Sequence, residues 1–283
     1  MPISPTTLDP LRDRRLALIG AGVIGRLLIR RLEALNLPPK QLMLCDADPA
    51  RGARLQREFE LKTCPLADAC CRADIWLIAT PPAAVISTLR VLAPRLEAGQ
   101  VVISFAAGVS MARLEAEVPA GVAVARIMPN ALSLIGRGVN PVAYGRDCTL
   151  QAMAEVQAIL NALGESIVLE DEQMNWAVGL TGASMRWLLP VLEGMTQAGL
   201  DAGLPEVDAR WLAASMMAGT AALALETTFS FDELKALTSV QAGDEEAIRR
   251  IFREAAHRAR RMAAEMASPI DRESDESTGE RVL

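Results

Sequence analysis

Near the N-terminus, the residues Gly20-Ala21-Gly22-Val23-Ile24-Gly25 have the G-x-G-x-x-G spacing of a loop that holds phosphate groups. A short apolar run, Arg15–Ile19, precedes the loop, and Arg26–Leu35 carries leucines at helical spacing after it. In such a unit the first glycine allows a tight turn, the second lets a pyrophosphate approach, and the third lets the helix pack closely. The free N–H groups at the helix start also favour an anion. The pattern predicts dinucleotide binding by Gly20, Ala21, Gly22, Val23, Ile24 and Gly25.

An acidic residue follows the next predicted strand. Gln41–Cys45 ends on Asp46, about 20 residues beyond the last glycine, where a carboxylate holds the adenosine ribose hydroxyls. A carboxylate resists the 2′-phosphate of NADP, whereas Arg51 and Arg54 just downstream could accommodate it. We therefore expect NAD(P)H as the cofactor, with NAD slightly favoured.

The elements that must position this loop follow an alternating pattern. The predicted strands are Arg15–Ile19, Gln41–Cys45, Ile75–Ala79, Val101–Phe105, Val122–Ile127 and Val139–Tyr144, with Ser166–Leu169 at an edge. The predicted helices between them are Arg26–Leu35, Pro49–Phe59, Ala83–Leu92, Met111–Val118 and Leu150–Leu163. Strands alternating with helices indicate an α/β fold with a doubly wound, mainly parallel sheet of the Rossmann type.

Ligands of such sheets lie beyond the carboxyl ends of the strands. The segments at those ends are small, rich in Gly and Pro, and nearly uncharged, which suits a flat cofactor. Besides the glycine loop and Asp46, the predicted cofactor-binding residues are Ala79, Thr80, Pro81, Ala106, Ala107, Met128 and Pro129. Asn130 follows them and is expected beside the nicotinamide.

From Asp171 onward no strand pattern remains. Helices are expected from Asp171, as N-cap, through Val178, over Ala183–Ala202 with a break or bend at Pro190, from Pro205 to about Thr228, and from Asp244 to about Glu265. The resulting organisation is a tail at 1–14, a dinucleotide-binding domain at 15–170, an all-helical dimerisation and substrate domain at 171–267, and a disordered tail at 268–283.

The middle of this helical half is apolar on every side. A helix that is apolar all round must be buried all round, and a small bundle cannot achieve this alone. We therefore predict an obligate homodimer formed through the C-terminal helices, with an interface that resembles a core. The alternative is a monomeric helical domain that covers the sheet, although apolar patches of that size are uncommon on monomers.

Composition excludes several classes of partner. The chain has 283 residues, 51% of them hydrophobic, and a net charge of −6, which argues against binding nucleic acid. The longest uncharged runs, Trp211–Leu225 among them, fall short of the ~20 residues that cross a bilayer. Residues 1–15 contain no apolar signal segment. With one His and five Cys lacking a C-x-x-C pair, we expect no metal site, and free thiols in a cytoplasmic protein.

Proton donors are scarce in this sequence. It has one His (His257), one Tyr (Tyr144) and three Lys, and none is expected beside the nicotinamide. Reduction of a carbonyl normally needs a positioned acid, whereas a protonated imine already carries its proton. This elimination favours reduction of C=N over C=O, with a water or a Ser/Thr hydroxyl left open as a proton source.

Several segments together resemble the pyrroline-5-carboxylate reductase family over residues 15–266. They are the glycine loop, Ala73-Asp74, Ser104–Val109, Arg126-Ile127-Met128-Pro129-Asn130 and Ala198–Pro205. The resemblance implies an N-terminal dinucleotide domain, a helical dimerisation domain that often assembles into rings of dimers, and a small imine substrate of proline biosynthesis. It also implies catalytic roles for Asn130 and Thr238.

The sequence departs from the family where substrate binds. The family's S-G-S-G-P-A-Y stands here as Thr181–Trp187, and its loop V-T/S-S-P-G-G-T/A-T as Leu237–Asp244. The resemblance implies substrate contacts for Thr181, Gly182 and Ser239. Arg186 departs from the family pattern, and it either binds an anionic group of the substrate in a different position or is buried in a salt bridge. Asp244 either faces the substrate, where it would repel a carboxylate, or caps the last helix. The expected substrate is therefore a small, cyclic or open imine, pyrroline-5-carboxylate or another.

Two other functions remain as alternatives. A β-hydroxyacid dehydrogenase shares the two-domain plan but needs a lysine in the first long helix, and residues 171–202 contain none. A dimer that binds the dinucleotide without turnover, as a sensor or scaffold, is supported by the altered substrate loop.

Overall fold

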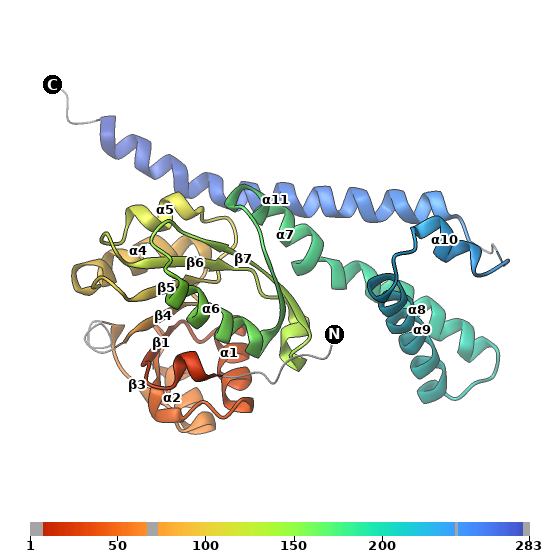
Figure 1. Cartoon of the computed structure of the whole chain (residues 1–283), viewed down its shortest axis with the longest axis horizontal. Helices are drawn as coiled ribbons and strands as arrows, with labels where there is room; N and C mark the ends of the chain where they lie inside the picture. The colour runs from red at the N-terminus through yellow and green to blue at the C-terminus, as the bar shows by residue number, and fades with distance from the viewer. Residues whose placement is uncertain (1–7, 67–72, 241–242, 280–283) are drawn as a thin grey trace. The chain divides into compact units, whose positions relative to one another are not determined.

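The computed structural model describes residues 8–66, 73–240 and 243–279 (Figure 1). The chain divides into two compact units, each considered by itself below. The sheet unit comprises residues 1–182 together with 258–283, and the helical unit comprises Ala183–His257.

The sheet unit is built on eight strands in the order β3-β2-β1-β4-β5-β6-β7-β8. Strands β1 to β6 are parallel, β7 runs antiparallel to β6, and β8 is parallel to β7. The strands are β1 Leu16–Ile19, β2 Leu42–Cys45, β3 Lys62–Thr63, β4 Ile75–Ile78, β5 Val101–Ser104, β6 Ala123–Ile127, β7 Gly138–Tyr144 and β8 Gly164–Val168. This confirms the doubly wound, mainly parallel sheet.

Helices cover both faces of this sheet. They are α1 Val23–Ala34, α2 Pro49–Phe59, α4 Pro82–Leu92, α5 Met111–Ala116 and α6 Leu150–Leu163. Successive residues of a strand point to opposite faces, so Leu16 and Leu18 join one apolar core while Ala17 and Ile19 join the other. The first core packs against α1, α2 and α6, and the second against α4 and α5. Because the central strands are buried on both faces, they read as continuous apolar runs in the sequence.

Two details of the sheet unit differ from expectation. The edge strand β3 was not predicted, because Lys62 and Thr63 are exposed and two residues carry no periodicity. Helix α1 begins at Val23, directly after Gly22, instead of at Arg26. The earlier start places the first turn of the helix inside the glycine loop itself.

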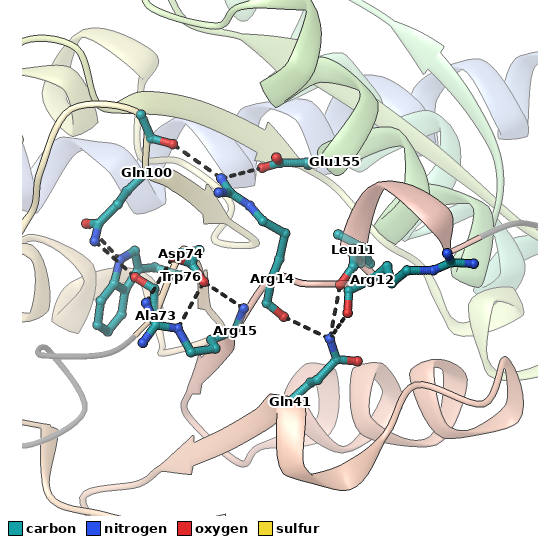
Figure 2. A network of polar contacts seen from close by, with 11 residues as sticks. Leu11, Arg12, Arg14, Arg15, Gln41, Ala73, Asp74, Trp76, Gln100 and Glu155 are labelled. Atoms are coloured by element: carbon teal, nitrogen blue, oxygen red, sulfur yellow. Dashed lines mark hydrogen bonds and ion pairs between the residues drawn. The ribbon is translucent and has the colours of Figure 1, made fainter.

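A polar network joins segments at the amino ends of the strands (Figure 2). Arg14 pairs with Glu155, a carboxylate on α6 that is 1% exposed, at 3.0 Å. Arg15 binds Asp74 through its backbone N–H and its guanidinium. Gln100 accepts from the Trp76 indole at 3.3 Å and donates to the Ala73 carbonyl. The contacts of Arg14 and Arg15 anchor the chain before β1 to α6 and to Asp74 before β4, although the sequence suggested only a tail at 1–14.

The chain after the sheet is helical. Its elements are a 3-10 turn Asp171–Gln173, α7 Met174–Ala177, a π-helical turn Val178–Gly182, α8 Ser184–Asp201, α9 Glu206–Glu226, α10 Phe231–Ala236 and α11 Glu245–Gly279. Helix α8 runs through Pro190 without ending there, and α8 packs on α9, where a Cβ at Gly199 would lie 2.8 Å from that of Ala209. Gly203, at φ +83°, closes the link between them.

Three expectations for this region need correction. Glu170, not Asp171, caps the first turn, in a capping box with Gln173. The capping box of Ser230 and Glu233 starts α10, a helix that the sequence reading did not identify. Helix α11 passes its expected end near Glu265 and continues to Gly279, within the segment expected to be a disordered tail.

The helical unit exposes large apolar side chains. Among its described residues only Ala209, Ala213 and Ala256 are buried, whereas Trp211 and Met216 of α9 are 66% and 61% exposed. A single chain therefore leaves the apolar face of α9 without cover. Within the described residues, no helix has both the length and the hydropathy that a membrane span requires.

Candidate dinucleotide site

A groove of about 1030 Å³ lies at the carboxyl ends of β1, β2, β4 and β5. Its walls come from the loops that directly follow these four strands, together with the start of α1 and one side of α4. The predicted cofactor-binding residues that line it are Gly20, Gly22, Val23, Ile24, Asp46, Ala79, Thr80, Pro81, Ala106 and Ala107. The strand order therefore brings together segments that are far apart in the sequence.

The three glycines of the loop have three different surroundings. At Gly20, φ is +98° and a Cβ would lie 2.6 Å from the Ala79 carbonyl oxygen. At Gly25, a Cβ would overlap the Gly20 carbonyl oxygen, so the helix could not approach the strand. At Gly22, a Cβ would meet no protein atom within 4 Å, because this position faces the groove. The loop thus leaves open the one position where a pyrophosphate must come close.

Asp46 connects the second strand to the glycine loop. Its carboxylate accepts from the Ala21 N–H at 2.6 Å and from the Asp48 N–H at 2.7 Å, and its side chain is 4% exposed. A carboxylate has about four acceptor positions, so two remain for other donors. Asp46 can therefore hold the loop and bind ribose hydroxyls at once.

Arg51 lies between two carboxylates. Its guanidinium is 3.6 Å from Asp46 and 3.5 Å from Asp48, whose other oxygen caps α2 by accepting from the Ala50 N–H. A 2′-phosphate at this point would meet two negative charges beside one positive charge. Arg54 is exposed and does not line the groove.

One side chain on the groove wall carries a buried hydroxyl. Thr80 Oγ1 is buried and makes no hydrogen bond with the described residues. A buried hydroxyl is normally satisfied, so this one fits a donor or acceptor on a bound ligand. Together with the open position at Gly22, it shows that the groove suits a dinucleotide.

The remaining predicted cofactor residues lie behind the groove or beside it. Ala21, Gly25 and Met128 are buried, and neither they nor Pro129 are among the groove's lining residues. The Asn130 amide donates to the Val139 carbonyl at 2.7 Å and accepts from the Leu132 N–H at 3.1 Å. Both ends of this amide hold the turn Ala131–Ile135 in place.

Sequence reasoning missed the role of Asp171. Its carboxylate pairs with the Arg126 guanidinium and accepts from the Met111 N–H at 2.9 Å, which joins β6, the start of α5 and the entry to the helices. Arg126 is 3% exposed, and its Nε has no partner among the described residues. The available signal was a charged residue in the apolar strand Ala123–Ile127, since a buried charge requires a partner.

The predicted substrate residues are divided between the two units. Thr181 and Gly182 end the π-helical turn of the sheet unit, where the Thr181 hydroxyl donates to the Ala177 carbonyl at 2.8 Å. Arg186, Thr238 and Ser239 belong to the helical unit. Thr238 Oγ1 accepts from the Val240 N–H at 3.5 Å in a local turn.

The alternative left open for Asp244 is resolved by its contacts. Its carboxylate accepts from the Ala247 N–H at 2.9 Å, so Asp244 caps α11. Loop residues 241 and 242 lie outside the described residues.

Other chemistry finds little support among the described residues. They contain no group of three or more His, Cys, Asp or Glu side chains that could hold a metal ion. Burial and the nearby Cys148 thiol raise the pKa of Tyr144, which closes β7 and does not line the groove.

Comparison with known proteins agrees with this division. Residues 15–108 match the family described as NADP oxidoreductase coenzyme F420-dependent, and residues 171–268 match pyrroline-5-carboxylate reductase dimerisation. The chain is 30% identical over 232 residues to a pyrroline-5-carboxylate reductase from Corynebacterium melassecola, covering 81% of this chain and 86% of that protein. It is 33% identical over 218 residues to one from Mycobacterium tuberculosis, which covers 75% of this chain and 74% of that protein.

The chain belongs to the pyrroline-5-carboxylate reductase family. Solved structures of that name share its fold: the Coxiella burnetii protein has a TM-score of 0.78 at 21% identity, covering 90% of this chain and 99% of its own. The Plasmodium falciparum protein, determined with NADP bound, has a TM-score of 0.78 at 18% identity, covering 90% of this chain and 98% of its own. As a pyrroline-5-carboxylate reductase family member, the chain uses NAD(P)H, and its dimerisation region supports a homodimer.

Proposed function

We propose that this protein is an NAD(P)H-dependent reductase that transfers a hydride to the C=N bond of a small cyclic imine, either pyrroline-5-carboxylate or a close analogue. The observation that carries the proposal is the groove of this family member, in which Gly22 is open and Thr80 Oγ1 has no hydrogen-bond partner within the described residues. The altered loop Leu237–Asp244 is the reason to include analogues.

The residues of the groove divide the work of binding. N–H groups at the start of α1, beside Gly22, bind the pyrophosphate, and Asp46 accepts from ribose hydroxyls. The small residues Ala106 and Ala107 allow a flat ring to lie against the end of β5. Reduced nicotinamide, when bound, supplies the hydride.

The positions of the charged residues in the groove favour reduction of an imine over reduction of a carbonyl. Its charged lining residues, Asp46, Asp48 and Arg51, gather after β2, at the adenosine end. Elsewhere in the groove the lining residues are uncharged, and the side-chain hydroxyls among them are those of Thr80, after β4, and of Ser87 and Thr88 in α4. Alcohols are poor general acids near neutral pH, whereas a protonated imine needs none to accept a hydride. In this proposal the Asn130 amide keeps the turn Ala131–Ile135 in place, and this turn supports the side of the site beside the nicotinamide.

Specificity and assembly extend the proposal. Asp46 and Asp48 beside Arg51 favour NADH over NADPH. Thr181, Gly182, Arg186, Thr238 and Ser239 bind the substrate, with Arg186 supplying the positive charge for its carboxylate. Assembly of dimers into a larger ring rests on the family resemblance, and a cytoplasmic location rests on the cysteine pattern of the sequence.

A substrate panel tests the proposal. The purified protein is given NADH or NADPH with pyrroline-5-carboxylate, its six-membered homologue, an imine without a carboxylate, and matching ketones and aldehydes. Oxidation of the cofactor by at least one imine, and not by the matching carbonyl compound, is the expected result. Turnover of carbonyl compounds alone would refute imine reduction. Tight cofactor binding with no turnover on any compound would instead favour the sensor or scaffold.

A further inference from the structure

Two cysteines meet beside the dinucleotide groove. The sulfur atoms of Cys45 and Cys64 are 3.6 Å apart, and neither residue forms a disulfide within the described part of the chain. Cys45 is the last residue of β2, and Cys64 directly follows β3. The parallel register pairs Leu44 with Thr63, so the next residues on the two strands, Cys45 and Cys64, lie side by side.

This arrangement is compatible with a disulfide. Adjacent strands are about 4.8 Å apart, and disulfide-linked residues have Cα atoms about 4.4 to 6.8 Å apart. The Cys64 N–H donates to the Leu44 carbonyl at 3.1 Å, which extends the pairing of β2 and β3 as far as the two cysteines. The backbone therefore already holds the cysteines within bonding range.

The position of Cys45 connects this pair to cofactor binding. Its side chain is 2% exposed and lines the groove, and its carbonyl accepts from the Gly20 N–H at 2.8 Å. The next residue is Asp46, whose carboxylate accepts from the Ala21 N–H. A change at Cys45 thus reaches both the glycine turn and the ribose-binding carboxylate.

We propose that Cys45 and Cys64 are a reversible oxidation site, at which a low-molecular-weight disulfide links the two residues and weakens dinucleotide binding. The more accessible Cys64 reacts first: its thiolate attacks the small disulfide, and one small thiolate leaves. The Cys45 thiolate then attacks the Cys64 sulfur and releases the second small thiolate. The pair loses two electrons and two protons, and one small disulfide becomes two thiols.

The linkage affects binding because the sulfur atoms must move from 3.6 Å to about 2.05 Å. The movement turns the Cys45 side chain within the groove wall and shifts the adjacent Asp46 relative to Ala21. We expect the Kd for NADH to rise about fivefold and to recover on reduction. Bound NADH should slow the oxidation, since Cys45 lies in the wall that the cofactor covers.

Oxidised glutathione is the probe, and peptide mapping identifies the bond. Cleavage after Lys and Arg and before Asp separates Gln41–Cys45 from Thr63–Ala67, and it removes Cys70 and Cys71 from the second peptide. The expected product is these two peptides joined by a reducible bond. NADH affinity is then measured by fluorescence on the same oxidised and reduced samples.

Cys64→Ser and Cys148→Ser are the matched variants. Cys64 does not line the groove, so Cys64→Ser should bind NADH normally and lose the response to oxidation, whereas Cys148→Ser should keep it. Oxidation without the joined peptides, or joined peptides with an unchanged Kd, would overturn the proposal. The two readouts are the disulfide-linked peptides and the affinity for NADH. The result is therefore independent of which substrate the enzyme reduces.

Discussion

Arg126 and Asp171, which are 45 positions apart in the sequence, form an ion pair that ties β6 to the first turn of the helical region. The guanidinium is 3% exposed and the carboxylate 25% exposed, and Asp171 also accepts from the Met111 N–H. One carboxylate thus fixes β6, the start of α5 and the point where the chain leaves the sheet.

Removing Asp171 should destabilise the sheet unit more than removing Arg126. Asp171→Ala leaves a buried guanidinium unpaired, and we expect a loss of about 3 kcal/mol in the free energy of unfolding. Arg126→Met leaves only a partly exposed carboxylate and should cost less. Urea denaturation measures both, with Glu172→Ala, an exposed neighbouring acid, as the control. Equal midpoints for Asp171→Ala and Glu172→Ala would contradict the assigned role.

Substitutions at two glycines of the loop should have different effects, one on stability and the other on cofactor binding. Gly25→Ala forces its Cβ into the Gly20 carbonyl and should cost about 2 kcal/mol or more of stability. Gly22→Ala meets no protein atom, so its Tm should stay near the wild-type value. Its Kd for NADH should nevertheless rise about tenfold, because the methyl group occupies the space of the pyrophosphate. Thermal melts and fluorescence titration test this pair, and unchanged NADH binding by Gly22→Ala would place the pyrophosphate elsewhere.

Asp46 should set the preference between the two cofactors. Asp46→Ala removes the ribose acceptor and one of the carboxylates beside Arg51, so the NADH-to-NADPH ratio of kcat/KM should fall about tenfold. Arg54 follows Arg51 by three positions in α2 but does not line the groove, so Arg54→Ala should leave that ratio unchanged. Steady-state kinetics with both cofactors decides the question. A preference for NADPH in the wild-type protein would show that Arg51 and not Asp46 dominates.

Asp74 should make part of the stability depend on acid pH. Burial raises the pKa of Asp74, but the hydrogen bonds and charge of Arg15 outweigh it, so this pKa lies below its ordinary value of 3.8. A lowered pKa in the folded state means a contribution that is present above 3.8 and lost as pH falls through the folded value. Relative to Asp74→Asn, the wild-type protein should be more stable by about 1 kcal/mol near neutral pH.

That difference should shrink once the pH falls below 3.8, because Asn does not titrate. Chemical denaturation over a pH series measures it. A gap between the two proteins that is constant across the series would show that charge on Asp74 contributes nothing.

The apolar face of α9 should require the second chain. We expect light scattering to report about twice the chain mass of 30.3 kDa. Met216→Glu places a charge in the middle of that face, and should release monomers or reduce solubility. Lys62→Glu, on the exposed strand β3, should leave the mass unchanged. A wild-type particle of 30.3 kDa would refute the dimer.

Much of this structure could be predicted from the sequence, because local interactions determine it. The central strands are buried on both faces and therefore appear as apolar runs in the sequence. Pro49–Phe59 and Leu150–Leu163 were predicted with the bounds that the structure gives. The roles of Gly20, Gly22 and Gly25 also follow locally, because a turn between a strand and a helix imposes the same steric demands wherever it occurs.

Only the tertiary structure showed which distant residues meet. The partner of Arg126, the contact of the Asn130 amide with the Val139 carbonyl, and the approach of Cys64 to Cys45 depend on the tertiary arrangement of the sheet unit. A two-residue edge strand carries no periodicity, so β3, and with it the cysteine pair, has no signal in the sequence. Long-range contacts such as these arise because packing brings segments together, and no local pattern encodes the partner.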